Sequence, residues 1–86
     1  MSQETLIDFP ADIAVKAMGL NQNDFETLVT QLLEPLLGSQ VATVTTLSSK
    51  GGKYLSVSVR FTATNLEQLH AIYAALRNEP RVLYTL

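Results

Sequence analysis

YLSVSVRFTA, residues 54–63, is the stretch from which the fold of this chain can be worked out. Apolar and polar side chains alternate along it, and successive side chains of a strand point to opposite faces. One face carries Leu55, Val57, Val59, Phe61 and Ala63, and the other carries Tyr54, Ser56, Ser58, Arg60 and Thr62. Because a strand buried on both faces would read as a continuous apolar run, we predict a strand with one face in the core. Its other face meets water or a partner.

Three more strand patterns flank this stretch. Residues 13–17 alternate in the same way, which predicts a first strand with Lys16 and Met18 on its polar side and Gly19 at its end. Residues 41–47 are rich in valine and threonine and carry no charge, which predicts a second strand. The loop 48–53 then joins the second strand to residues 54–63 as a hairpin. Residues 81–86 predict a short last strand.

A first helix is predicted between the first two strands. Apolar residues recur at helical spacing over residues 25–36, after Asn21 and Asn23 as alternative N-caps. Gly38 closes this helix. Pro35 lacks a backbone N–H and collides with the preceding turn, so the helix ends or kinks near it.

A second helix is predicted over residues 66–76, with Asn65 and Gln68 as a capping box at its start and Pro80 beyond its end. The order strand, helix, strand, strand, helix, strand is that of ferredoxin-like folds. We therefore predict an α+β protein of ferredoxin-like βαββαβ topology, a four-stranded antiparallel sheet with two helices on one face. The first and third strands are central, and the other face of the sheet is open.

Length and composition limit the class of protein. The 86 residues suffice for one domain, and we assign residues 1–10 to an N-terminal arm anchored by Phe9 and residues 11–86 to a single domain. The absence of cysteine excludes disulfides and thiolate chemistry. A net charge of −2 does not favour nucleic acid as a partner. Since the sequence shows neither a signal-peptide pattern nor an apolar run of about 18 residues, we expect a cytoplasmic protein without membrane contact.

Catalytic chemistry has little support in the sequence. His70 is the only histidine, which excludes paired-histidine and cysteine–histidine sites, and we expect it to pack on the second helix. We expect no catalytic residue, no metal and no cofactor. The loop 48–53 offers Ser49, Lys50 and Gly51 to an anion, but it lacks the Walker spacing and joins two strands. A solvated hairpin is therefore favoured, and a small enzyme that uses Lys50 or a serine is an alternative.

A binding surface is the function class that remains. The open face of the sheet is expected to carry Lys16, Met18, Tyr54, Ser56, Ser58 and Arg60. RNA binding is the weaker alternative, because it needs stacked aromatic side chains on the two central strands and only Tyr54 and Leu83 add bulk to this face. A homodimer through the sheet and strand addition at an edge both use features of this fold. A monomer with a hydrated sheet is the plain alternative.

The chain also resembles a known family. The resemblance rests on Leu6-Ile7-Asp8-Phe9-Pro10, on Lys16-Ala17-Met18-Gly19, on Ser48-Ser49-Lys50-Gly51 with residues 54–59, and on Ala63-Thr64 followed by Glu67-Gln68. These segments are similar to the small YbeD-like proteins of proteobacteria, the UPF0250 family of unassigned function, from about Leu6 to Leu86. The resemblance implies the ferredoxin-like fold and a similarity to ACT-type regulatory domains, which bind small molecules or pair through their sheets. Genes for lipoate attachment often lie beside those of the family, which implies a regulatory link to lipoate metabolism.

The resemblance implies a possible effector site as well. ACT-type domains hold their effector at the turn after the first strand, here Gly19 to Asn23. Gly19 permits close backbone approach and Asn21 or Asn23 can hydrogen-bond a polar ligand, whereas a turn glycine and a capping asparagine are the structural alternative. Members of the resembled family have a shorter turn where this chain reads Gly51-Gly52-Lys53-Tyr54, so the length of this loop varies and a ligand site in it is less favoured. We therefore expect a non-enzymatic regulatory or adaptor domain that binds a protein or a small metabolite through the open face or these loops.

Overall fold

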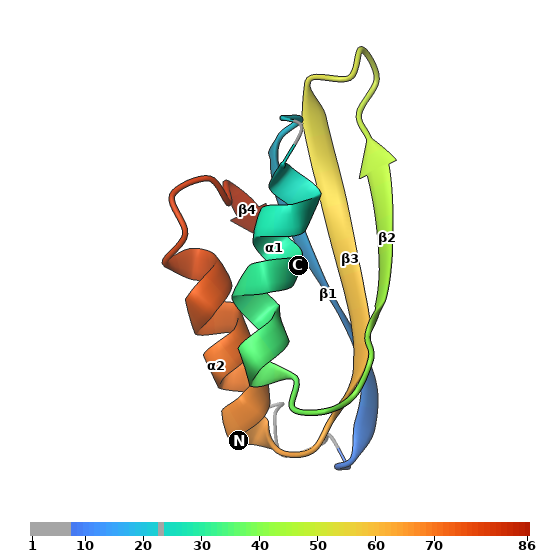
Figure 1. The fold of residues 1–86 in the computed structure, drawn as a ribbon, viewed down its shortest axis with the longest axis vertical. Coiled ribbons are helices and arrows are strands. Elements are labelled where there is room, and N and C mark those ends of the chain that lie inside the picture. The colour runs from blue at the N-terminus through green and yellow to red at the C-terminus, as the bar shows by residue number, and fades with distance from the viewer. Residues whose placement is uncertain (1–7, 23) are drawn as a thin grey trace.

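The computed structural model describes residues 8–22 and 24–86, and its elements follow the predicted order. The strands are β1 (Ala11–Leu20), β2 (Thr43–Ser48), β3 (Tyr54–Ala63) and β4 (Tyr84–Thr85). The helices are α1 (Phe25–Leu33) and α2 (Leu66–Arg77), and a short 3₁₀ turn, η2 (Glu34–Leu36), follows α1. Both helices lie on the same side of the sheet (Figure 1). The predicted ferredoxin-like α+β fold is confirmed.

β1 and β3 form the centre of the sheet, whose strand order is β2-β3-β1-β4. All neighbouring strands are antiparallel, and β1 pairs with β3 along its whole length, from Ala11 opposite Ala63 to Leu20 opposite Tyr54. Residues that face each other across two strands share a face of the sheet. The alternation along β3 therefore determines which side chains of β1 and β2 point away from the helices.

The core lies between the sheet and the two helices. Its fully or almost fully buried members are Val15 and Ala17 of β1, Val57, Val59, Phe61 and Ala63 of β3, Phe25, Val29 and Leu33 of α1, Leu37, and Leu69, Ile72 and Leu76 of α2. The predicted apolar faces of the central strands and of α2 are thereby confirmed. The helices leave β2 uncovered: Val44 is its one partly buried residue, and Figure 1 shows this strand at the edge away from both helices.

α1 begins differently from the prediction, but its α-helical part ends beside Pro35, as predicted. Its N-cap is Asp24, which makes no side-chain capping bond, so Asn21 is not the cap, and Asn23 lies outside the described residues. The α-helical part ends at Leu33, and Pro35 stands in the 3₁₀ turn that follows, where a missing N–H is tolerated. Gly38 then adopts a φ of 74°, a left-handed conformation that favours glycine.

Gln68 ties the start of α2 to the end of η2. The side-chain oxygen of Asn65 accepts a hydrogen bond from the Gln68 N–H at 2.8 Å, which confirms the predicted cap. The Gln68 side chain accepts from the Thr64 N–H at 2.8 Å and donates to the Leu36 carbonyl at 2.9 Å. One glutamine thus satisfies backbone groups at two helix termini that would otherwise need water.

The prediction starts the second strand at Val41, whereas β2 begins at Thr43 in the structure, and Gln40 explains this difference. Its side-chain amide donates to the Thr62 carbonyl at 2.8 Å and accepts from the Thr62 N–H at 2.9 Å. This amide takes the place that the backbone of residue 41 would have in the ladder with β3. The chain at Val41 is therefore free to leave the sheet, and Val41 is 95% exposed.

β4 is shorter than the predicted strand of residues 81–86. The N–H of Val82 is still bonded within the turn that follows α2, and the chain reaches β1 at Leu83, whose N–H donates to the Met18 carbonyl at 2.8 Å. Beyond Thr85, Leu86 and Lys16 exchange two backbone hydrogen bonds of 2.9 and 3.0 Å. Strand pairing therefore continues to the last residue, although the regular strand is short.

Gly19 lies inside β1 and not at its end, because pairing continues to Leu20. A Cβ at this position would lie 2.5 Å from the Arg81 carbonyl oxygen and 2.6 Å from two ring carbons of Phe25. No side chain fits at such distances. Glycine is therefore required for packing, because it lets the first residue of α1 and the segment before β4 meet on a central strand.

We expect Gly19→Ala to lower the free energy of unfolding by about 1–3 kcal/mol, since the Phe25 ring and a backbone carbonyl must both move to admit a methyl group. Urea denaturation followed by circular dichroism measures the change. Ser58→Ala, on the open face of β3, is the control and should change stability by less than about 0.5 kcal/mol. A Gly19→Ala protein as stable as the native chain would contradict the required close approach.

Candidate functional site

The open face of the sheet brings the predicted surface residues together. Lys16, Met18, Tyr54, Ser56, Ser58 and Arg60 all alternate with core residues on β1 or β3 and so share this face. Lys16 stands opposite Ser58, and Met18 stands opposite Ser56. The two central strands therefore place a cation and a thioether in the middle of the face.

Apolar side chains from the edge strands extend this face, and sequence reasoning missed them. β2 contributes Leu47, in the row of Met18, and β4 contributes Tyr84, directly opposite Met18. Leu20 stands at the end of β1, and Leu86 pairs with the backbone of Lys16. These four side chains are 43–74% exposed. With Met18 they form what we call the apolar patch.

The position of Leu83 differs from the prediction that it adds bulk to the open face. Tyr84 occupies the place opposite Met18 instead. Leu83 is 58% exposed and lines a small hollow beside Leu20 and Pro80 at the end of the sheet. The sequence does show Tyr84 and Leu86 alternating with Leu83 and Thr85. Which of the two sets points to the open face depends on the residue at which the chain first pairs with β1.

The other end of the open face is polar. Arg60 Nε lies 3.5 Å from Asp12 Oδ1, with both side chains about two-thirds exposed, and Thr43 of β2 stands opposite Arg60. An exposed pair at this distance contributes little to stability, because solvent screens it and both side chains lose rotamer freedom. Arg60 therefore stays available to a partner at little energetic cost.

Charge is separated between the sheet and the helices of the described chain, and Asp8, before β1, belongs to neither group. The sheet and its β2–β3 hairpin carry four cations, Lys16, Lys50, Lys53 and Arg60, and one acid, Asp12. The helices and the segments beside them carry five acids, Asp24, Glu26, Glu34, Glu67 and Glu79, and two cations, Arg77 and Arg81. The open face thus lies on the cationic side of a chain whose net charge is negative.

The β2–β3 hairpin is closed by its own hydrogen bonds. The Ser49 hydroxyl accepts from the Tyr54 N–H at 3.0 Å, and the Gly52 N–H donates to the Ser49 carbonyl at 2.8 Å. Gly51 and Gly52 both have positive φ, which this turn requires. Lys53 places its ammonium group 5.4 Å from the centre of the Tyr54 ring. The geometry thus gives Ser49 and Gly51 clear roles in forming the turn.

The turn after β1 is filled by internal contacts. Asn21 donates from its side chain to the Gly52 carbonyl at 3.0 Å and from its backbone to the Lys53 carbonyl at 2.8 Å. Gly19 is buried against Phe25, so it presents no surface to a ligand. Asn21 therefore joins this turn to the hairpin, and the hollow of about 170 Å³ that borders the turn is lined by Leu20 and Gln22 and not by Gly19 or Asn21.

Asp24 and Arg81 close the same region on the helix side. Arg81 makes two hydrogen bonds to the Asp24 carboxylate, of 2.8 and 3.1 Å, and its guanidinium lies 5.8 Å from the centre of the Phe25 ring. The hydrogen bond from Arg81 lowers the pKa of the Asp24 carboxyl group. This paired geometry holds the segment before β4 against the start of α1.

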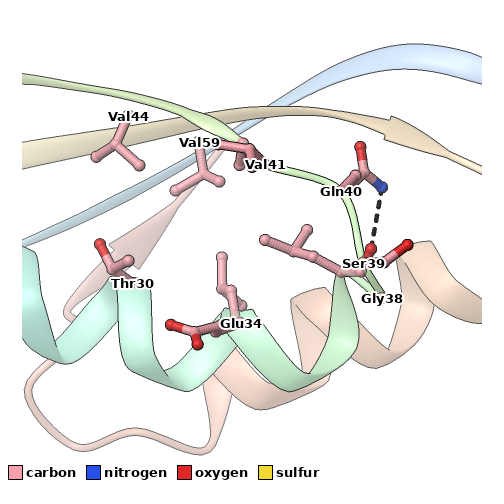
Figure 2. Close-up of a pocket in the computed structure, with 11 residues that line it drawn as sticks. Thr30, Glu34, Gly38, Ser39, Gln40, Val41, Val44 and Val59 are labelled. Atoms are coloured by element: carbon pink, nitrogen blue, oxygen red, sulfur yellow. Dashed lines mark hydrogen bonds between the residues drawn. The ribbon is translucent and has the colours of Figure 1, made fainter.

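A groove lies between α1 and β2, with a volume of about 370 Å³. Figure 2 shows Val44 and Val59 of the sheet on one side of it and Thr30 and Glu34 on the other. Buried side chains of α1 and the loop after it form its floor, and Val41 stands at its mouth. Residues 37–42, which lead from η2 to β2, line one end of the groove, where Gln40 takes the place of residue 41 beside β3.

The residues considered for other chemistry lie on exposed parts of the described chain. No group of three or more His, Asp or Glu side chains there is placed to hold a metal ion. His70 is exposed on α2, and Lys50 stands in the exposed hairpin. Neither described helix has the length and apolar character needed to span a bilayer.

Comparisons with known proteins find both sequence relatives and a similar fold. Residues 4–86 match the model of a family described as "Protein of unknown function (DUF493)". A UPF0250 protein of Bordetella pertussis is 38% identical over 81 residues, which cover 93% of this chain and 89% of that protein. One from Paraburkholderia phymatum is 38% identical over 80 residues, covering 92% and 90%. The solution structure of a protein from H. pylori superposes with a TM-score of 0.76 at 20% identity, covering 100% of this chain and 94% of the other, which supports the fold.

We expect the Asp24 carboxyl group to titrate below its ordinary pKa in the native chain and closer to it in Arg81→Gln, because the guanidinium hydrogen bond favours the ionised form. Since the pKa is depressed in the folded state, the pair stabilises the fold fully above the unfolded pKa and loses that effect as pH falls through the folded value. Carbon-detected NMR titration of the carboxyl group measures the shift. Arg77→Gln is the control, and an equal shift in both variants would contradict the assignment.

Proposed function

We propose that this chain, which belongs to the DUF493 family and is related to the UPF0250 proteins, is a non-enzymatic adaptor domain that binds another protein through the open face of its sheet. The observation that carries this proposal is the apolar patch. Single exposed apolar side chains are normal on soluble proteins, but four of the six large ones that are exposed in the described chain, all except Val41 and Leu83, gather on one face. Both helices lie on the other side of the sheet (Figure 1).

The shape of the face favours a protein over a small metabolite. Its described hollow, between Ala14, Thr43 and Arg60, has a volume of about 140 Å³. Small-molecule sites usually occupy roughly 300–1,000 Å³ and enclose most of the ligand. A broad surface with apolar side chains at one end and charges at the other instead has the composition of a protein interface.

Charge supports a partner that differs from this chain. Two copies placed face to face would bring the cations of both sheets together, and like charges across an interface oppose association. A partner with acidic groups around an apolar surface would complement Lys16 and Arg60. The implied link to lipoate metabolism makes the enzymes that attach lipoate the first candidates, and the cytoplasm the expected place of binding.

RNA binding is less well supported than protein binding. Base stacking on a sheet of this topology needs aromatic side chains on the two central strands. Tyr54 is the aromatic residue that β1 and β3 contribute to the open face, and Tyr84 stands on the edge strand β4. An enzyme that uses Lys50 or a serine lacks a nearby base in the hairpin and strand that hold them.

We expect a photo-reactive benzoylphenylalanine at Ser56 to cross-link a specific protein in an extract of the source cells, and the same group at Thr27 on α1 not to do so. Lys16→Glu should weaken the binding of that purified protein by about tenfold at low salt, because it reverses a charge in the middle of the face. Arg77→Glu on α2 is the matched control and should leave binding unchanged. Isothermal titration calorimetry measures both, and circular dichroism verifies folding.

Three outcomes would contradict this assignment. Cross-linking at Thr27 with the same yield would place the interface on the helices. An adduct that contains only a second copy of this chain would replace the adaptor by a homodimer. Equal losses of affinity in Lys16→Glu and Arg77→Glu would show an effect of net charge and not of the face.

A further inference from the structure

We propose that the free edge of β2 accepts an extended segment of a partner protein as a fifth strand, with an apolar side chain of that segment in the groove between β2 and α1. This site is distinct from the open face. It uses the backbone of an edge strand and the helix-side surface beside it, and it does not depend on the adaptor proposal.

The hydrogen-bond phase of the sheet identifies the free backbone groups of β2. Ser49 donates to the Tyr54 carbonyl, and the Gln40 amide pairs with Thr62, so alternate residues of β2 bond to β3. In an antiparallel ladder every second residue of a strand bonds to the same neighbour. Counting from Ser49 and from the place that Gln40 fills, the residues of β2 that bond to β3 are Thr43, Thr45 and Leu47. The N–H and C=O groups of Val44, Thr46 and Ser48 therefore point away from the sheet, where a further strand would pair with them.

Nothing in the sequence of β2 protects this edge. Natural sheets usually block an exposed edge with a lysine, a proline, a bulge or a covering element. Residues 41–49 contain no charged residue, no glycine and no proline, and they are rich in β-branched side chains. The described residues of β2 are mostly exposed, so no helix covers the edge either. Such an edge is the feature that strand-addition domains use.

The groove lies where a fifth strand would place its side chains. Val44 points to the helix side of the sheet and lines the groove with Val59 (Figure 2). A strand paired with β2 would lie about 4.8 Å beyond it, and every second side chain would point to the same side as Val44. The groove, with a volume of about 370 Å³, has room for one or two apolar side chains but not for the surface of a folded protein.

The negative charge at the rim of the groove favours one kind of bound segment. Glu34 stands at the rim of the groove, and α1 carries no basic residue. A segment with a basic residue beside its apolar side chain would pair with Glu34. The occupant is therefore an extended, basic and apolar segment of another protein.

Phage-displayed random heptapeptides, selected on the full chain, test this proposal. We expect enrichment of sequences that place an apolar residue within two positions of Lys or Arg. A synthetic peptide of the enriched sequence should lose at least about tenfold in affinity with Thr46→Pro, which removes one outward N–H from an edge strand that tolerates proline there. Thr46→Ala keeps that N–H and should bind within about twofold of the native chain.

Hydrogen exchange on the native chain gives an independent measurement if Thr46→Pro fails to fold. The bound peptide should slow exchange at the outward amides of Val44 and Thr46 and leave Thr45 and Leu47 unchanged, because these already bond to β3. Glu34→Lys should lower the affinity of basic peptides and favour acidic ones.

Several results would overturn the proposal. One is a selection without enrichment, and another is a bound peptide that protects amides elsewhere than β2. Equal binding by Thr46→Pro and Thr46→Ala would show that backbone pairing is not involved. Protection of Val44 and Thr46 in the free protein that grows with its concentration would assign the edge to a second copy.

Discussion

The close approach of the Phe25 ring and the Arg81 carbonyl to Gly19 fixes how three segments meet on the central strand. α1 starts there, and the segment that leads to β4 passes there. The hydrogen-bonded pair of Asp24 and Arg81 lies over the same contact, so an ion pair and a packed ring hold one junction. Because β4 reaches β1 directly after this junction, the junction also sets the phase that puts Tyr84 on the open face.

The rest of the architecture follows from two helices on a four-stranded sheet. α1 and α2 bury the helix side of the central strands, and β2 stays outside their cover (Figure 1). Side-chain amides complete the backbone pairing where regular elements stop: Gln40 continues the ladder beyond β2, and Gln68 joins the termini of α2 and η2. These amides satisfy backbone groups inside the fold, whereas the outer edge of β2 and the open face of the sheet remain exposed.

Much of this fold could be predicted from local pattern. The alternation along β3 and the Asn65 cap act over a few residues, so the sequence near them is sufficient to predict them. The positions that prediction missed depend on residues far apart in the chain. Gln40 has no local signal for its pairing with Thr62, and Gly19 resembles a turn glycine until Phe25 and Arg81 are brought to it by the fold. Leu47 belongs to the apolar patch because of its register with β3, which no single strand pattern determines.

The separation of cations and acids gives the molecule an electric dipole that runs from the helices to the sheet. A dipole of this kind turns a protein in the field of a charged partner before the two surfaces touch, and it acts mainly on the rate of encounter. Near an acidic surface the protein would turn its sheet toward that surface, although the negative net charge of the chain alone would be repelled by it. Salt shortens the reach of that field to roughly 8 Å at physiological ionic strength, so orientation happens only in the last few water layers.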